Sequence, residues 1–444
     1  MAALLLVLVS ACTSATPTDD ARTSPPMESA PVDDGRPAVV LSVVVSVTGP
    51  TAASDRSYLD GIRLAEREVH ARGGVAGRDL RIEIADDRGD AGRARALLEG
   101  MLAARKSAAV LLVGDGRPLV ALRRQMEAFG GPAVLLAGDL YSSRSLYRYV
   151  FQASVPVLWQ ARAIARYVVR DRRHGRVLLV TESGGAPGAR TAFDAAMAEE
   201  GARMARRLTV SPGDGLRAVM ASATDAHAVV FLGGTLTATR LSRVLSRRED
   251  PPQLVVSCEA LAPQFAAAGP RAGTVTPYPY TWAGWARPIP RVRAFRSRFR
   301  DEFGRLPAGH EQEGYDAVRA LVDALRRTRG RRGPRLVRAL ESLPWRPYSS
   351  LSVQLGPDDH VFLGEHEVGM FAVPGPNERA EPWVGPRTPW RPIMRTFTPD
   401  LKRTGIPDRD KRVFFPRWRK NRPAPKYWNS RYGIVTRPRQ DPLH

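Results

Sequence analysis

The residues of this chain that could do chemistry are acids and hydroxyls that follow short apolar runs, without the partners that catalysis requires. His310-Glu311-Gln312-Glu313 lacks the second histidine of a zinc hydrolase motif. Gly114-Asp115-Gly116 lacks the third glycine of a dinucleotide-binding loop. No nucleophile elbow, Ser-x-x-Lys pair or phosphate-binding loop occurs. The sequence therefore predicts a protein that is not an enzyme and that holds no metal or cofactor.

Cys12 and Cys258 are the only cysteines, which excludes a disulfide framework. Cys12 follows the aliphatic run Ala2–Val9 and two small residues, an arrangement that looks like a bacterial lipoprotein signal with Cys12 as the lipidated residue. No Lys or Arg precedes the run, which departs from that pattern, and a frayed N-terminal strand is the alternative. Residues 13–37 include 12 Ser, Thr or Pro, so they predict a flexible tether. We expect an extracytoplasmic, membrane-anchored protein.

The net charge of +22 is unevenly distributed. Residues 385–444 contain 16 Lys or Arg against 4 Asp or Glu, together with ten prolines and three tryptophans. Proline at this density prevents long helices and central strands. We expect this segment to lie along the body as an extended arm with its basic face toward an anionic surface or partner. Nucleic-acid binding is not expected, because it would rest on charge alone.

An alternation of strands and helices from residue 38 positions the candidate residues. Hydrophobic periodicity predicts a first run with strands at 39–45, 80–84, 109–113, 133–136 and 149–153 and helices at 58–71, 90–104 and 119–129. A second run has strands at 177–180, 205–210, 228–232 and 254–256 and helices at 158–170, 192–200, 216–223 and 237–246. Helices at 292–303, 313–327 and 334–341 follow, then a hairpin-like pair at 351–355 and 361–371. Such alternation builds parallel sheets.

Several motifs in this order resemble the type I periplasmic binding proteins, specifically the leucine/isoleucine/valine-binding branch that serves branched-chain amino-acid ABC importers. The resemblance covers about residues 38–375. It is carried by Thr48-Gly49-Pro50, Asp60-Gly61-Ile62-Arg63-Leu64-Ala65, residues 72–78, Asp86-Asp87, residues 149–156, Pro212-Gly213-Asp214, Gly233-Gly234 and Gly314-Tyr315-Asp316-Ala317.

The resemblance implies an α/β fold of two doubly wound parallel-sheet lobes joined by a hinge, which close over a small ligand. It implies lobe I at 38–153 with a return segment at 283–345, and lobe II at 154–282 with the hairpin at 346–375. A signal at 1–12, the tether at 13–37 and the basic extension at 376–444 lie outside the lobes. The implied partners are an ABC permease and ATPase, and the protein is expected to be a monomer.

The resemblance also implies ligand contacts at loops that follow the strands. In lobe I these are Thr48 in the opening loop, and Asp115 with Arg117 and Asp139 in the turns after the third and fourth strands, where the hydroxyl-rich residues of the family are replaced. Two acids there disfavour a carboxylate and favour a cationic or neutral polar ligand, and Arg117 can offset one of them. In lobe II, Thr235 stands where an aromatic residue is common, and Glu259 aligns with the carboxylate that pairs with a ligand ammonium. A helix N-terminal acid is the alternative role for Glu259.

Tyr278, Tyr280 and Trp282 could form an aromatic wall, with packing at the hinge as the alternative. The alternative function for the same fold is that of a sensory or regulatory module. Closure of its lobes would be signalled to a protein partner instead of a permease.

Overall fold

The computed structural model describes residues 38–136, 148–183, 188–202, 206–212, 216–270, 273–279, 282 and 290–343. It also describes short segments at 346–347, 352–353, 355–357, 360–363 and 368–373. All of them belong to one compact unit that begins at Pro37. The expected lipidation site Cys12, the tether, Asp139, Tyr280 and the basic extension lie outside the described residues.

The first sheet has five parallel strands in the order β2-β1-β3-β4-β5. They are β1 (Val39–Val45), β2 (Leu80–Asp86), β3 (Ala109–Val113), β4 (Ala133–Leu136) and β5 (Val150–Gln152). The run of β-branched residues in β1 is buried on both faces, as a central parallel strand requires. Alternate residues enter two different apolar clusters, because Leu41 and Val43 pack on the side of α1 and α11, whereas Val44 packs on the side of α2.

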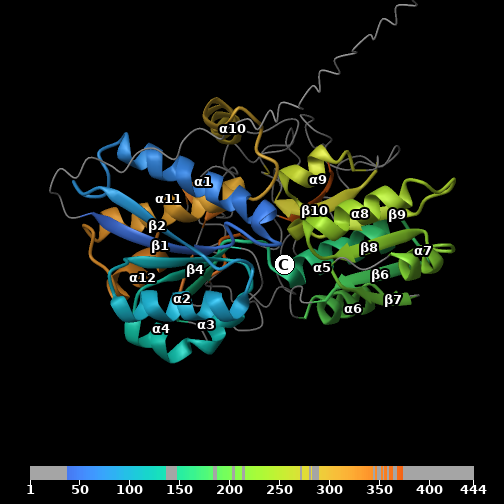
Figure 1. The fold of residues 1–444 in the computed structure, drawn as a ribbon, viewed down its shortest axis with the longest axis horizontal. Helices are drawn as coiled ribbons and strands as arrows, with labels where there is room; N and C mark the ends of the chain where they lie inside the picture. The colour runs from blue at the N-terminus through green and yellow to red at the C-terminus, as the bar shows by residue number, and fades with distance from the viewer. Residues whose placement is uncertain are drawn as a thin grey trace, which may run out of the picture. The chain divides into compact units, whose positions relative to one another are not determined.

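The helices of this part are α1 (Ala52–His70), α2 (Ala91–Ala104), α3 (Arg117–Ala121) and α4 (Arg123–Phe129), with α10 (Pro290–Phe303), α11 (Glu311–Arg327) and α12 (Pro334–Glu341) from later in the chain. Helices α1 and α11 cover one face of the sheet, and α2, α3 and α4 cover the other (Figure 1). Asp90 caps α2 by accepting a hydrogen bond from Arg93 N.

Helices α1 and α11 cross at glycines. A Cβ placed on Gly61 would lie 1.8 Å from the carbonyl oxygen of Glu311, and one on Gly314 would lie 2.3 Å from that of Tyr58. Only glycine permits this approach of the two backbones.

The second sheet has six strands in the order β13-β10-β9-β8-β6-β7, and β13 alone is antiparallel to its neighbour. They are β6 (Val177–Glu182), β7 (Arg206–Val210), β8 (Ala228–Leu232), β9 (Gln253–Val256), β10 (Val275–Pro279) and β13 (Val368–Ala372). The helices are α5 (Val157–Arg166), the π-helical turn η2 (Tyr167–Asp171), α6 (Ala189–Glu199), α7 (Arg217–Ser222), α8 (Thr235–Leu245), the 3-10 turn η3 (Cys258–Ala260) and α9 (Pro263–Ala267). The predicted α/β class with two doubly wound sheets is confirmed.

The predicted hairpin at 351–355 and 361–371 is wrong. Strand β12 (Ser352–Val353) pairs with β11 (Arg346–Pro347), while β13 pairs with β10 and Val361 bridges to Gln152. The sequence pattern did not predict β10, because Pro277 and Pro279 argue against a strand. They are tolerated because β10 pairs with β9 only at Val275. The predicted helix at 119–129 is two helices that meet at Leu122.

Among the described residues, none of the helices combines the length and the apolar character needed to cross a bilayer.

Candidate functional site

The carboxyl edge of each sheet contains a topological switch point. Strand β1 lies between β2 and β3, and β6 lies between β7 and β8, so the connections on the two sides of each strand leave in opposite directions. In open α/β sheets, ligands bind in the crevice outside the strand ends at this place. The candidate site is therefore built from the loops that follow β1 and β3 in the first sheet and β6, β8 and β9 in the second.

Thr48 lies in the loop after β1 and is hydrogen-bonded to Asp86 at the end of β2. Its backbone N–H and its hydroxyl donate to the Asp86 carboxylate at 3.2 and 2.6 Å, and Val47 N donates at 2.9 Å. The hydroxyl of Thr48 and the surrounding N–H groups lower the pKa of Asp86 to about 2. Asp86 thus fixes the shape of the loop that carries Thr48.

Two buried acids, Asp55 and Asp87, lie next to this loop. Ser46 Oγ donates to Asp87 at 2.7 Å, and Thr51 Oγ1 donates to Ser46 Oγ at 2.7 Å. Burial raises the pKa of Asp55 to about 6, although hydrogen bonds from neighbouring hydroxyls oppose the shift. Sequence reasoning missed Asp55. The available signal was an acid in the first turn of a helix directly after a switch-point loop.

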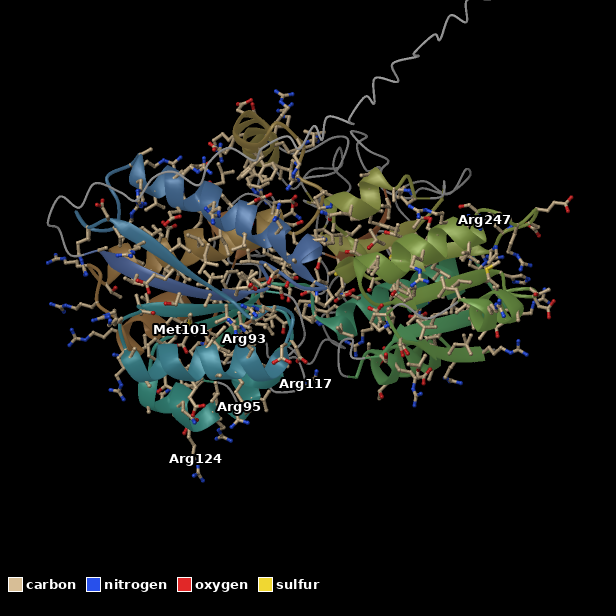
Figure 2. All side chains as sticks on the ribbon, in the orientation of Figure 1. Arg93, Arg95, Met101, Arg117, Arg124 and Arg247 are labelled. Atoms are coloured by element: carbon tan, nitrogen blue, oxygen red, sulfur yellow. The ribbon has the colours of Figure 1, made fainter. Side chains whose placement is uncertain are left out.

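Asp115 and Arg117 follow β3, the neighbour of β1. Arg117 N donates to Asp115 Oδ1 at 2.8 Å, and the Arg117 guanidinium forms an ion pair with the same carboxylate. Arg117 therefore offsets the negative charge of Asp115 by direct contact with its carboxylate. Arg117 is the first residue of α3 and is exposed, at the opposite end of the helix layer from Met101 (Figure 2).

In the second sheet, Glu182 ends β6 and occupies the N-terminus of α8. Its Oε2 accepts a hydrogen bond from Gly234 N at 2.8 Å, and its Oε1 accepts one from Thr237 Oγ1. A Cβ on Gly233 would lie 2.7 Å from the Glu182 Cβ, so this approach requires a glycine after β8. Because a helix N-terminus attracts anions, Glu182 takes the place that a ligand carboxylate could use. The sequence analysis did not single out Glu182.

Thr235 and Glu259 lie side by side at the ends of β8 and β9, as candidate residues of one site should. Thr235 Oγ1 donates to Ala260 O at 3.2 Å and lies 3.5 Å from Glu259 O. Glu259 Oε1 accepts a hydrogen bond of 2.8 Å from Gln160 Nε2. Gln160 is 1% exposed, whereas Glu259 is half-buried. The carboxylate is therefore held in place by a buried amide that the sequence analysis missed.

Tyr278 lies in β10 and is fully buried. Its hydroxyl is 3.3 Å from His310 Nδ1, and its ring lies 5.2 Å from that of Trp282. His310 also contacts Glu313 at 2.9 Å and stacks on Tyr58 from α1 at 4.5 Å. Burial lowers the pKa of His310, but the nearby carboxylates of Glu313, Glu311 and Glu259 together outweigh it, and the net shift is upward. Tyr278 thus belongs to a buried network that joins β10 to α1 and α11.

The candidate residues form two groups. Within the described residues, hydrogen bonds join the η3 loop to Thr235 and Gln160, but none joins Thr48 to Asp115. No group of three or more His, Cys, Asp or Glu side chains in the described part of the chain could hold a metal ion.

The sequence pattern described as periplasmic binding protein matches residues 38–372, which is most of the chain and both sheets. The chain belongs to the periplasmic binding protein family. The resemblance to its leucine/isoleucine/valine-binding branch is confirmed. Family membership places this binding protein outside the cytoplasm and gives it a binding role rather than an enzymatic one.

Solved structures of low sequence identity share the fold of this periplasmic binding protein. The leucine-binding protein LivK of Thermotoga maritima is 18% identical, with a TM-score of 0.68 over 78% of this chain and 98% of its own. The branched-chain amino acid transporter substrate-binding protein LivJ of Streptococcus pneumoniae, solved with isoleucine, is 16% identical. Its TM-score is 0.66 over 78% of this chain and 99% of its own.

A curated relative is the Leu/Ile/Val-binding protein of Rhizobium johnstonii, 24% identical over 193 residues. The matched region covers 40% of this chain and 48% of the relative, so this periplasmic binding protein spans about half the length of the curated relative that it matches.

Proposed function

We propose that this protein captures a small polar ligand between two lobes and delivers it to an ABC importer. Lobe I comprises residues 38–153 with 283–345, and lobe II comprises residues 154–282 with the later segment that supplies β13. The observation that carries the proposal is the fixed carboxylate of Glu259, which lies beside Thr235 at the carboxyl edge of the second sheet. Because a buried amide already orients this carboxylate, its side chain loses little conformational entropy when a ligand binds.

The ligand carries an ammonium or an amide N–H group toward lobe II. Among the described residues, only one oxygen of Glu259 has a hydrogen-bond partner, so Oε2 can accept from the ligand. Glu182 fills the nearby helix N-terminus, which leaves no vacant anion site there. Relatives solved with isoleucine and leucine support amino acids and their amides as the first compounds to test.

Thr48, Asp115, Arg117 and Asp139 contribute the lobe I side of the proposed site, while Tyr278 supports the site from the buried network. Cys12 carries the lipid that anchors the protein, and residues 13–37 tether the lobes to it. The protein acts as a monomer with permease and ATPase subunits as its partners.

A thermal-shift screen of the full chain with Cys12→Ser tests this function. The panel contains amino acids, amides, polyamines and small organic acids. A ligand at 100 times its Kd stabilises the native state by about 2.7 kcal/mol, which gives a clear rise in Tm. Stabilisation by a cationic or neutral polar compound is expected. Stabilisation by none of them contradicts the receptor function and favours a sensory module that acts through a protein partner.

A further inference from the structure

Five cations gather at the amino edge of the first sheet, opposite the candidate site. They are Arg105, Lys106, Arg329, Arg331 and Arg332, called here the basic exit surface, and all five are exposed. Arg105 and Lys106 lie between α2 and β3, and the three arginines lie between α11 and α12. The first connection leads into the start of β3, and Arg332 of the second contacts its backbone, so both connections lie at the same edge. Figure 2 shows side-chain nitrogens beyond the Met101 end of α2, where this edge lies.

Direct contacts hold the two connections together. Arg332 Nη1 donates to Arg105 O at 3.1 Å and also to Lys106 O. A Cβ on Gly330 would lie 3.1 Å from Arg78 Nη1 and 3.9 Å from the Val39 side chain. The basic exit surface is therefore a defined part of the fold and adjoins the first residue of β1.

The cations of this surface are not balanced by acids. Within the described residues, none of the five forms an ion pair. The amino edge of the second sheet differs, because its connections expose acids as well as cations: Arg173, Arg176 and Arg247 with Asp225, Glu249 and Asp250, besides the half-buried Arg172 and Arg248. Among the exposed residues of these connections, the excess of positive charge is thus found at one edge only.

Helix termini account for part of the charge. Helices α2 and α11 both end at this edge, and cations near a helix C-terminus are favourable. Helix α8 ends at the corresponding edge of the second sheet, where acids accompany the cations. The helix dipole therefore does not explain why acids are missing from the basic exit surface.

The N-terminal segment enters the fold at this same edge. Arg78 Nη2 donates to Ala38 O at 3.0 Å, and β1 begins at Val39. We infer that the basic exit surface rests on the anionic headgroups of the membrane to which the tether leads. The inference relies on the anchored location in the proposed function but not on the ligand.

The dimensions of the tether agree with this docking. A flexible segment of the length of residues 13–37 has an end-to-end distance of about 25–30 Å, which exceeds the Debye length of about 8 Å. At the full reach of the tether, the headgroup charges are screened from the basic exit surface. They attract it only when it lies against the bilayer. Each cation that lies against anionic headgroups then contributes about 1 kcal/mol. Docking at this edge leaves the opposite, carboxyl edge of the sheet free for ligand.

Vesicle co-sedimentation of the unlipidated full chain, Cys12→Ser, tests the inference. The vesicles contain phosphatidylcholine alone or phosphatidylcholine with phosphatidylglycerol. The test variant is Lys106→Glu/Arg329→Glu/Arg331→Glu, and the matched control is Arg173→Glu/Arg176→Glu/Arg247→Glu, which has the same net charge. Three cations at about 1 kcal/mol each predict a roughly 100-fold loss of partitioning for the test variant. The control should lose less than about tenfold.

An equal loss for both variants overturns the inference, because bulk charge or the basic C-terminal extension then accounts for binding. Equal partitioning of the parent into both kinds of vesicle, or into neither, also overturns it. If the glutamate variant does not fold, the same three positions are changed to Gln, and a smaller but still selective loss is expected. The thermal shift by any ligand should be the same for test variant and parent, which keeps this result separate from the proposed function.

Discussion

Gln160 and Glu259 are joined by a 2.8 Å hydrogen bond across 99 residues of sequence. Gln160 uses its whole amide, because Nε2 also donates to Val155 O at 3.0 Å and Oε1 accepts from Cys258 N at 3.0 Å. Val155 belongs to the segment that leads from β5 into α5, so one buried side chain connects the crossing between the two sheets to the candidate ligand carboxylate.

Gln160→Met should destabilise the protein by about 2–4 kcal/mol. The substitution keeps the length of the side chain but leaves a buried N–H and a buried C=O without partners, at about 1–3 kcal/mol each. Urea unfolding measures the change. Gln125→Met is the control, because the Gln125 amide makes only one bond of 3.3 Å, to Glu99 on the surface of neighbouring helices. A loss below about 1 kcal/mol for Gln160→Met contradicts the bridging role.

Gly61→Ala should be costly, whereas Gly100→Ala should not. The new Cβ at position 61 meets the Glu311 carbonyl and forces α1 away from α11, which places the cost at or above the upper end of about 1–3 kcal/mol. Gly100 lies in α2 with no atom within 4 Å of a Cβ, so alanine should stabilise by about 0.5–1 kcal/mol. Thermal unfolding of the two variants gives opposite signs if the crossing is as close as described.

Asp55 should make the protein less stable as pH rises from about 4 to 6. Its pKa rises from 3.8 to about 6 on folding, so the unfolded state loses its proton first and the folded state is penalised at higher pH. The penalty at neutral pH is about 3 kcal/mol. Asp55→Asn should remove this part of the pH dependence and increase stability at pH 7, as chemical denaturation at several pH values can show.

Asp86 should have the opposite effect on the pH dependence of stability. Its pKa of about 2 lies below the ordinary value of 3.8, so its carboxylate stabilises the fold above pH 4 and this contribution is lost as pH falls toward 2. Asp86→Asn should therefore lower stability at pH 7. If both asparagine variants change stability in the same direction, the assigned environments of the two acids are wrong.

Cys258 should resist thiol reagents in the native state. It is 3% exposed, and burial raises its pKa well above the ordinary value, so little thiolate is present. In the Cys12→Ser chain it is the only thiol, and its labelling should be slow in buffer and rapid in urea. Fast labelling of the native protein would show that the η3 loop opens readily.

The strands and most helices could be predicted because their signals are local. Residues 39–45, 109–113, 133–136 and 228–232 were predicted with the observed bounds, since buried parallel strands are short β-branched runs. Strand β10 and the partner of β13 could not, because two prolines interrupt the strand pattern of β10 and its pairing with β13 joins segments that lie far apart in sequence.

The candidate site was less accessible to sequence reasoning. Thr235 and Glu259 were found because they follow strands, and the structure places them in contact. Gln160 and Glu182 were missed because their roles depend on distant partners, Glu259 for one and the N-terminus of α8 for the other. Nothing in the local pattern of α5 or β6 distinguishes these side chains from ordinary polar residues.

The most direct test of the central claim is the thermal shift of the Glu259→Gln variant with the compound that stabilises the parent chain most. Glutamine can still accept the hydrogen bond from Gln160, so the Tm without ligand should stay within a few degrees of that of the parent. The loss of the negative charge should weaken binding at least about tenfold, because a hydrogen bond to a charged group contributes about 1.5–3 kcal/mol. A shift that equals that of the parent at every concentration would show that the ligand does not bind at Glu259.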